Sequence, residues 1–276
     1  MRIVPAVESL VFSLLDAHHA GESYGSVWSD GTYMYVACRY QGIRAYSFDG
    51  SSLTLLATQI DGGIYMVVWG DGTYIYAACW NVGIRTYTFN GTSFTLLDTQ
   101  DDGGYYYSVW SDGTYVYVAC WGDGIRAYGF DGTSFTLLDT HNAGGFYYPY
   151  VWGDGTYIYV ACSGDGIRAY SFNGATFTLL DTQDDGHSYE AVWGDGTYVY
   201  VACWTDGIRA YTFDGTSFTL LDAQDDGGYY EGVWGDGTYT YISCGYAGIR
   251  AYSFPQKPKL GYSLPPVDFS EIVGVV

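Results

Sequence analysis

Lysine is almost missing from this chain: its two copies are Lys257 and Lys259, and none lies between residues 3 and 254. Basic residues number 10 against 30 acidic ones, which gives a formal net charge of −20. A protein that binds nucleic acid needs a basic surface that neutralises phosphates. The composition therefore excludes nucleic acid from the expected partners.

Long apolar runs are also scarce. The longest near the N-terminus covers residues 10–15, and Glu8 precedes it. About 18 consecutive apolar residues are needed to span a bilayer, and a secretory signal needs a basic start and a longer apolar segment. We therefore expect no membrane span and no targeting segment in this sequence.

A repeat of about 41 residues occupies most of the chain. Six times, a Val-Trp pair is followed ten residues after the tryptophan by a cysteine. Successive tryptophans are separated by 41, 41, 42, 41 and 41 residues, and they are Trp28, Trp69, Trp110, Trp152, Trp193 and Trp234. A period near 40 predicts a β-propeller. The near-identity of the copies indicates recent duplication or a consensus-built sequence.

Each copy contains four runs that are typical of β-strands. In the third copy they cover residues 106–110, 114–120, 125–130 and 134–139. An Asp-Gly pair separates the first run from the second and the third from the fourth. This pair favours a tight hairpin, because glycine accepts the positive φ of the turn. We expect four antiparallel strands per blade, named A to D from the central channel outwards.

The two ends of the chain predict how the ring closes. Residues 11–16 match strand D without a preceding A, B or C, whereas residues 248–254 match strand C with no D after it. The N-terminal strand should complete the last blade, which leaves no unpaired edge. The fold class is thus all-β, a six-bladed β-propeller over residues 1–254, followed by a Pro-rich tail over 255–276.

The residues that recur in each blade resemble the repeats of a known protein family. Residues 115–119 read Tyr-Val-Tyr-Val-Ala, and residues 124–126 read Gly-Ile-Arg. These runs are similar to the LVIVD-type (YVTN-like) repeats of bacterial and archaeal propeller proteins, over roughly residues 10–254. The resemblance implies a surface or binding role and supplies no catalytic residues.

Six cysteines end strand B in six different blades. Strand B should lie about 10 Å from the ring axis, given a strand spacing of about 4.8 Å. Equivalent cysteines are then too far apart for a disulfide or a shared metal. Unpaired thiols and the missing signal peptide favour a reducing, cytoplasmic compartment. The cysteines are Cys38, Cys79, Cys120, Cys162, Cys203 and Cys244.

Six arginines share one position of strand C. We interpret them as a repeated packing device in which each guanidinium lies against an aromatic ring. The alternative is a ring of anion sites. They are Arg44, Arg85, Arg126, Arg168, Arg209 and Arg250.

The blades differ on one face. The D-to-A and B-to-C loops should emerge together on this loop face, while the Asp-Gly hairpins lie on the opposite hairpin face. Residues three places before each tryptophan and just after each cysteine vary between copies. The candidate ligand-binding residues among them are Tyr40, Met66, Trp80, Tyr107, Trp121, Glu190, Trp204, Glu231 and Tyr246.

Paired aspartates also occur in the D-to-A loops. Carboxylates beside glycine are suited to Ca²⁺, but their spacing matches no known calcium loop, and solvated acidic turns are the favoured interpretation. We expect no metal and no cofactor. The weak metal candidates are Asp101, Asp102, Asp184, Asp185, Asp225 and Asp226.

These patterns favour a monomeric, non-enzymatic binding or scaffold module for a protein or glycan, because exposed aromatic rings dominate such contacts. One alternative is a lectin-like protein with repeated carbohydrate sites between blades. A second is a hydrolase that uses Glu190 and Glu231. A third is a structural component of a surface or particle.

Overall fold

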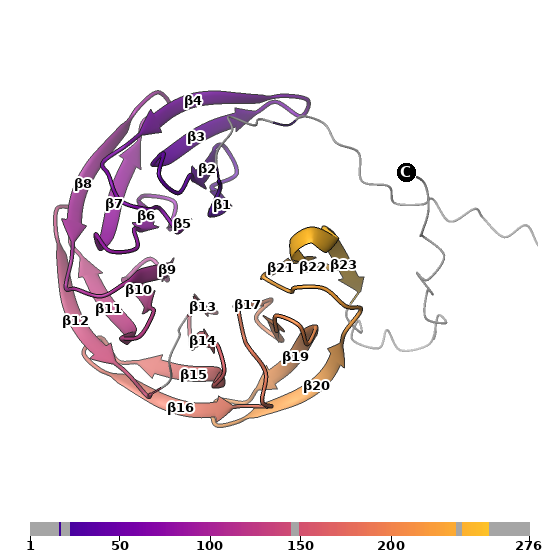
Figure 1. Ribbon diagram of the computed structural model, residues 1–276. Helices are drawn as coiled ribbons and strands as arrows, with labels where there is room; N and C mark the ends of the chain where they lie inside the picture. Colours follow the sequence, from indigo (N-terminus) through magenta and orange to yellow (C-terminus); the bar gives the residue numbers. More distant parts are fainter. Residues whose placement is uncertain (1–16, 18–22, 145–148, 236–238, 254–276) are drawn as a thin grey trace, which may run out of the picture.

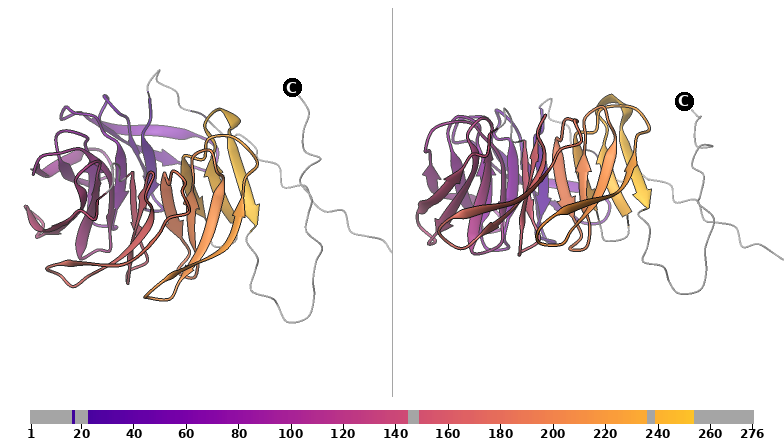
Figure 2. Two further views of the ribbon diagram at one scale, coloured as in Figure 1. Left: turned by 60° about the horizontal axis from the view of Figure 1, so that its bottom comes forward. Right: turned by 90° about the horizontal axis from the view of Figure 1, so that it is seen from below.

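Six antiparallel β-sheets surround a central channel (Figure 1) in the computed structural model, which describes residues 17, 23–144, 149–235 and 239–253. Within each sheet the strands follow one another in sequence order, with the first strand innermost. Viewed from the side, the strands run between the two faces of the ring (Figure 2). The protein is a six-bladed β-propeller, and the predicted fold class is confirmed.

Blades 1 to 3 each contain four strands. Blade 1 consists of β1 (Ser26–Ser29), β2 (Met34–Ala37), β3 (Ile43–Phe48) and β4 (Leu53–Gln59). Blade 2 consists of β5 (Val67–Gly70), β6 (Ile75–Ala78), β7 (Ile84–Phe89) and β8 (Phe94–Gln100). Blade 3 consists of β9 (Tyr106–Ser111), β10 (Tyr115–Cys120), β11 (Gly124–Phe130) and β12 (Phe135–His141).

Blades 4 and 5 repeat this order, and blade 6 has three described strands. Blade 4 consists of β13 (Tyr150–Gly153), β14 (Ile158–Cys162), β15 (Gly166–Phe172) and β16 (Phe177–Gln183). Blade 5 consists of β17 (Ala191–Gly194), β18 (Val199–Ala202), β19 (Ile208–Phe213) and β20 (Phe218–Gln224). Blade 6 consists of β21 (Gly232–Gly235), β22 (Tyr239–Ser243), the 3-10 turn η1 (Gly245–Ala247) and β23 (Ile249–Ser253).

The predicted closing strand, residues 11–16, lies outside the described residues, as does the tail over 255–276. Both therefore stay predictions. Blades 1 and 6 differ from the others in exposure: Val27 is 63% exposed, whereas the equivalent Val192 of blade 5 is 0% exposed. Trp234 and Ile249 of blade 6 are also exposed.

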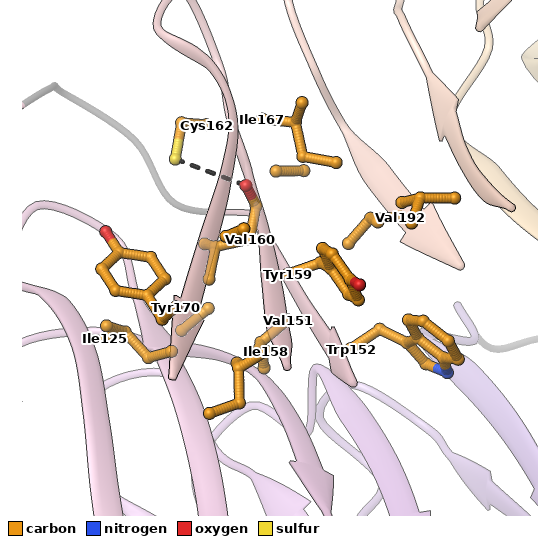
Figure 3. Close-up of a cluster of buried hydrophobic side chains, with 14 of the residues drawn as sticks. Ile125, Val151, Trp152, Ile158, Tyr159, Val160, Cys162, Ile167, Tyr170 and Val192 are labelled. Carbon is orange, nitrogen blue, oxygen red and sulfur yellow. Dashed lines mark hydrogen bonds between the residues drawn. The ribbon is translucent and has the colours of Figure 1, made fainter. Parts of the chain in front are cut away.

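The core fills the spaces between blades. In blade 4 every residue of β14 is buried, because a neighbouring blade covers each face of the sheet. Figure 3 shows side chains of three blades meeting here, with Ile125 of blade 3 on one side of the sheet and Val192 of blade 5 on the other. This two-sided burial explains why apolar residues occur at both parities along the strand.

The tryptophans of blades 1, 3, 4 and 5 pack against the next blade. Trp152 stacks on Tyr159 of its own blade, with ring centroids 5.8 Å apart. A Cβ at Gly194 of blade 5 would lie 2.8 Å from Cζ3 of Trp152. The indole of the preceding blade therefore leaves no room for a Cβ at Gly194. The tryptophans and hairpins of blades 2 to 6 line the channel at the hairpin face, around a cavity of about 1000 Å³.

All six cysteines are free and buried. Burial raises the pKa of the Cys162 thiol to about 12, and its Sγ donates to the carbonyl of Val160 at 3.7 Å. Thiols with such pKa values are poor nucleophiles. The cysteines therefore act as small packing residues at the loop-face end of strand B.

Candidate functional site

The hairpin face repeats one set of hydrogen bonds. In blade 4 the Oδ1 atom of Asp154 accepts from the backbone N–H groups of Thr156 and Tyr157, both at 2.8 Å, and its Oδ2 accepts from the Tyr159 hydroxyl at 3.0 Å. Each carboxylate thus satisfies its own turn. The equivalent aspartates with the same partners are Asp30, Asp71, Asp112 and Asp195.

On the loop face, the strand C arginines hold the D-to-A loops. Nη1 of Arg85 donates to the carbonyl of Gly62 at 2.6 Å and to the Tyr65 hydroxyl at 2.8 Å, while Nη2 donates to the carbonyl of Asp61 at 2.8 Å. The guanidinium also lies 5.3 Å from the centroid of the Tyr65 ring. Because these donors already serve loop carbonyls, the geometry favours the packing interpretation over a ring of anion sites.

Four of the B-to-C loops bridge their blade to the next one, in the residues that the structure describes. Trp80 has φ of +33°, and its carbonyl accepts from the backbone N–H of Tyr106 in blade 3 at 2.7 Å. Arg39 and Trp204 have φ of +39° and +31° at the equivalent positions. A left-handed φ is unfavourable for side chains with a Cβ, and glycine adopts it freely, as Gly245 does in blade 6. Three large side chains are thus held on strained backbone.

An aromatic cluster forms where blade 2 meets blade 3. The bridge between Trp80 and Tyr106 fixes the register, and side chains alternate along a strand. Tyr106 is therefore buried, while Tyr105 and Tyr107 flank the indole. Tyr105 stacks on Trp80 with centroids 4.6 Å apart, and Tyr107 meets it edge-on at 5.9 Å.

Trp121 of the blade 3 B-to-C loop completes this cluster. Its ring lies edge-on to Trp80 at 5.4 Å and tilted against Tyr107 at 5.9 Å. Its backbone N–H donates to the carbonyl of Tyr105 at 2.9 Å. Trp121 and Tyr105 are exposed. We name Trp80, Tyr105, Tyr107 and Trp121 the aromatic cluster.

A cavity of about 410 Å³ lies beside the aromatic cluster on the loop face. Trp80 and Tyr107 form part of its wall. Residues of blade 1 and of the chain entering blades 1 and 2 supply the rest: Ser23, Arg39, Tyr40, Ile64 and Met66. The cavity therefore combines aromatic and aliphatic walls with one cationic side chain, within the volume range of small-molecule sites.

The structure brings together five of the nine predicted ligand-binding residues. Tyr40, Met66, Trp80 and Tyr107 line the cavity, and Trp121 contacts two of them. The other four do not line it. Trp204 packs on Tyr229 in a separate pair with centroids 4.8 Å apart, and Tyr246 is fully exposed in η1.

Glu190 and Glu231 lie at the loop face of blades 5 and 6, at the position of Tyr107 in blade 3. The Glu190 Oε1 atom accepts from the Ser188 hydroxyl at 2.8 Å and from the Ser163 hydroxyl at 3.4 Å. Burial raises the pKa of Glu190, these hydrogen bonds oppose the rise, and the charge of Glu231 adds to it. The negative charge of Glu231 on the adjacent blade therefore disfavours ionisation of Glu190.

The first aspartate of each loop pair bonds to its own turn, and the second bonds to strand C of the blade that the loop enters. Asp101 Oδ1 accepts from the Gly103 N–H at 2.9 Å, and Asp184 and Asp225 repeat this bond. The second aspartate of each pair accepts a hydrogen bond from a strand C tyrosine hydroxyl. For Asp102 the distance from its Oδ2 atom to the Tyr128 hydroxyl is 3.1 Å. Within the described ranges, no group of three His, Cys, Asp or Glu residues is placed to hold a metal ion.

Sequence reasoning did not select Arg39, Tyr105, Ser23 or Ile64. Arg39 had one available signal: among residues 3–254 it is the one arginine that lies outside the repeated strand C position. Tyr105 had none, because its contact with Trp80 depends on a bridge between two blades.

Comparison with known proteins supports the fold alone. No family model matches the chain, and no curated protein matches it in sequence, so the LVIVD-type resemblance stays a prediction. A functionally unknown protein from Desulfotomaculum acetoxidans is 14% identical, with a TM-score of 0.74 over 84% of this chain and 83% of its own. A provisionally named 6-phosphogluconolactonase from Bacteroides fragilis is 16% identical, with a TM-score of 0.71 over 82% and 78%.

A third similar structure is the β-propeller domain of Cps50 (Swd1) from Myceliophthora thermophila. It is 10% identical, with a TM-score of 0.70 over 84% of this chain and 82% of that one. The names of these three proteins differ widely, which agrees with the rule that propellers host unrelated activities. In the part of the chain that the structure describes, no helix is long and apolar enough to cross a membrane.

Proposed function

We propose that this protein is a non-enzymatic binding module that holds one ligand on the loop face, in the cavity beside the aromatic cluster. The observation that carries the proposal is the convergence of Tyr40, Trp80 and Tyr107 from three blades on one cavity of about 410 Å³. Such a volume suits a small molecule or the terminal sugar of a glycan, and indole and phenol faces stack on sugar and aromatic rings.

Backbone strain supports the same site. Arg39 and Trp80 occupy left-handed positions at which glycine would be less strained, and both side chains line the cavity. Strained residues of this kind concentrate at ligand-binding sites. Two of the three strained residues therefore line the proposed site, and the third, Trp204, lies outside it.

The non-repeating character of the cluster favours one site over six. At the position of Trp80 the other blades carry Arg39, Trp121, Ser163, Trp204 and Gly245. Between blades, the positions equivalent to Tyr106 are filled by buried tyrosines such as Tyr189 and Tyr230. A lectin-like protein with one sugar site per blade predicts about six ligands per chain, whereas our proposal predicts one.

A hydrolase is the alternative function. It would rely on Glu190, whose raised pKa keeps more of the acid form available for proton donation. Hydrolysis of chromogenic glycosides or esters by the wild type, together with its loss in Glu190→Gln, would support that alternative against ours.

The experiment is a screen of glycans and small aromatic ligands against three proteins. These are the wild type, the double variant Trp80→Ala/Trp121→Ala and the matched control Trp204→Ala. We expect a ligand that binds the wild type and the control but not the double variant. Equal binding by all three proteins would contradict the proposed site.

A further inference from the structure

Arg39 differs from the other arginines of the described chain. The six strand C arginines are buried or partly buried in the blades, where those with assigned partners bond to loop carbonyls, tyrosine hydroxyls or a cysteine sulfur. Arg39 lies instead in the B-to-C loop of blade 1 and lines the loop-face cavity. It is the one basic residue in that wall.

One N–H donor of the Arg39 guanidinium bonds to a weak acceptor, and the group has four more. Its side-chain hydrogen bond runs from Nη1 to the Met66 Sδ atom at 3.0 Å. A thioether sulfur is a weak acceptor, and a guanidinium carries five N–H donors. Among the residues that the structure describes, none forms an ion pair with Arg39. A fork of N–H donors that meets no carboxylate among the described residues therefore belongs to the cavity wall.

The other side chains of the cavity wall could contact the face of a ring-shaped ligand. Trp80 and Tyr107 offer aromatic surface, and Ile64 and Met66 supply an aliphatic side. A guanidinium binds a carboxylate through two parallel hydrogen bonds, which fixes the orientation of the bound group. The cavity thus matches a ligand in which a carboxylate is attached directly to a ring.

The overall charge makes this match selective. The chain carries a net charge of −20, so an anionic ligand is repelled by most of the surface. At physiological ionic strength, fields between exposed charges fade over about 8 Å. An anion is then held only where a cation faces it directly, and Arg39 is that cation in the cavity wall.

We propose that the loop-face ligand is a ring that carries a carboxylate, either an acidic sugar or an aromatic acid, and that Arg39 binds the carboxylate. This inference rests on the proposed function, since it assigns chemistry to the same cavity. It adds that the preference for acid over neutral ligands comes from one side chain, while the affinity for the ring comes from the aromatic cluster.

The test uses two matched pairs of probes: glucuronate with glucose, and benzoate with benzyl alcohol. Binding of each probe is measured by titration calorimetry or ligand-observed NMR at millimolar concentrations. The proteins are the wild type, Arg39→Gln, Arg39→Lys and Trp80→Ala, with melting temperatures recorded as the control for folding.

We expect the wild type to bind the acidic member of one pair about ten- to a hundredfold more tightly than the neutral member. Arg39→Gln should abolish that preference without weakening the neutral probe, and Arg39→Lys should retain part of it. Equal binding of acid and neutral probes, a preference that survives Arg39→Gln, or no binding of either acid would overturn the inference. If Trp80→Ala binds every probe as tightly as the wild type does, the proposed function fails, whatever the result for the Arg39 variants.

Discussion

On the hairpin face, the aspartate that follows each tryptophan makes the same three hydrogen bonds in five blades, as Asp154 does with Thr156, Tyr157 and Tyr159. On the loop face, the residue after each cysteine changes from Arg39 to Trp80 to Ser163 around the ring. The two faces belong to the same repeat and the same strands, so their difference does not come from the fold.

This comparison separates two kinds of constraint. Hairpin residues satisfy their own backbone, so any blade with the same turn needs the same residues. Loop residues such as Trp80 and Arg39 retain a strained backbone that glycine would relieve. The repeated face therefore reports on folding, and under the proposed function the face that varies reports on binding.

The largest effect is expected from a change on the hairpin face. Gly194→Ala places a Cβ 2.6 Å from the Tyr198 carbonyl oxygen and 2.8 Å from the Trp152 ring. Overpacking of this kind lowers the free energy of unfolding by about 1–3 kcal/mol. Urea denaturation measures the change.

The matched control for that variant is Ser111→Ala in blade 3. Ser111 occupies the position of Gly194, already carries a Cβ, and would lose the bond from its hydroxyl to the Tyr115 carbonyl at 2.9 Å. We expect a loss of about 1 kcal/mol. Equal effects at the two positions would show that the indole contact does not select glycine.

A smaller effect on stability is expected on the loop face. Trp80→Gly removes a left-handed strain of about 1–2 kcal/mol and also the contacts of a partly buried indole. Because the two terms oppose each other, the free energy of unfolding should change by less than about 1 kcal/mol. A loss above 3 kcal/mol in the same denaturation measurement would make Trp80 a structural residue and weaken the contrast between the faces.

The Glu190 carboxyl should give a pH-dependent effect. Burial raises its pKa, so its protonated form is favoured in the folded state. The stability linked to that proton is present below the ordinary carboxyl pKa and is lost as the pH rises through the raised value. Glu190→Gln should therefore melt higher than the wild type at pH 8 and at the same temperature at pH 3.

The control for this variant is Glu231→Gln. Glu231 is exposed, so removing its charge should change melting at pH 8 less than Glu190→Gln does. A Glu190→Gln protein that melts below the wild type at pH 8 would mean that its hydrogen bonds to Ser188 and Ser163 outweigh the burial of charge.

The smallest effect is expected at the outer hairpins. The hydroxyl of Thr133 holds the pKa of Asp131 at about 2, and the hydroxyl of Thr216 does the same for Asp214. A depressed carboxyl pKa contributes stability that is present above the unfolded value and is lost as the pH falls through the folded value. Acid melting curves between pH 4 and pH 2 measure this contribution.

Asparagine stands at the same hairpin position in blades 2 and 4, where Asn90 and Asn173 accept equivalent backbone bonds. The double variant Asp131→Asn/Asp214→Asn should therefore match the wild type near neutrality and lose less stability between pH 4 and pH 2. Parallel acid melting curves for the two proteins would contradict this account of the turn.

The fold could be predicted because the same residues recur at the same spacing in every repeat. The Asp-Gly turns and the Trp-to-Cys spacing define strands A and B of every blade, and the tryptophans of blades 1, 3, 4 and 5 each lie against the glycine that follows the next blade's tryptophan. The site could be predicted only in part. Trp80, Trp121 and Trp204 look alike in sequence, but the residues across each blade junction decide which of them form a cluster. Tyr105 and Tyr107 flank Trp80, whereas Glu231 and Gly245 replace two cluster members near Trp204.

The strain at Arg39 and Trp80 could not be read from the sequence either: Ser163 makes the same bridge to the next blade, and its φ is not positive. The variable positions predicted the face on which the cavity lies. The contacts between blades identified the residues.

The most direct test of the central claim is the binding stoichiometry of the first ligand found in the screen. It should be measured by calorimetry on the wild type, Trp80→Gly and Trp204→Gly, two variants that make the same change at the same backbone conformation. We predict one ligand per chain for the wild type and Trp204→Gly, and loss of binding in Trp80→Gly. A stoichiometry near six, or equal binding by both variants, would contradict the account.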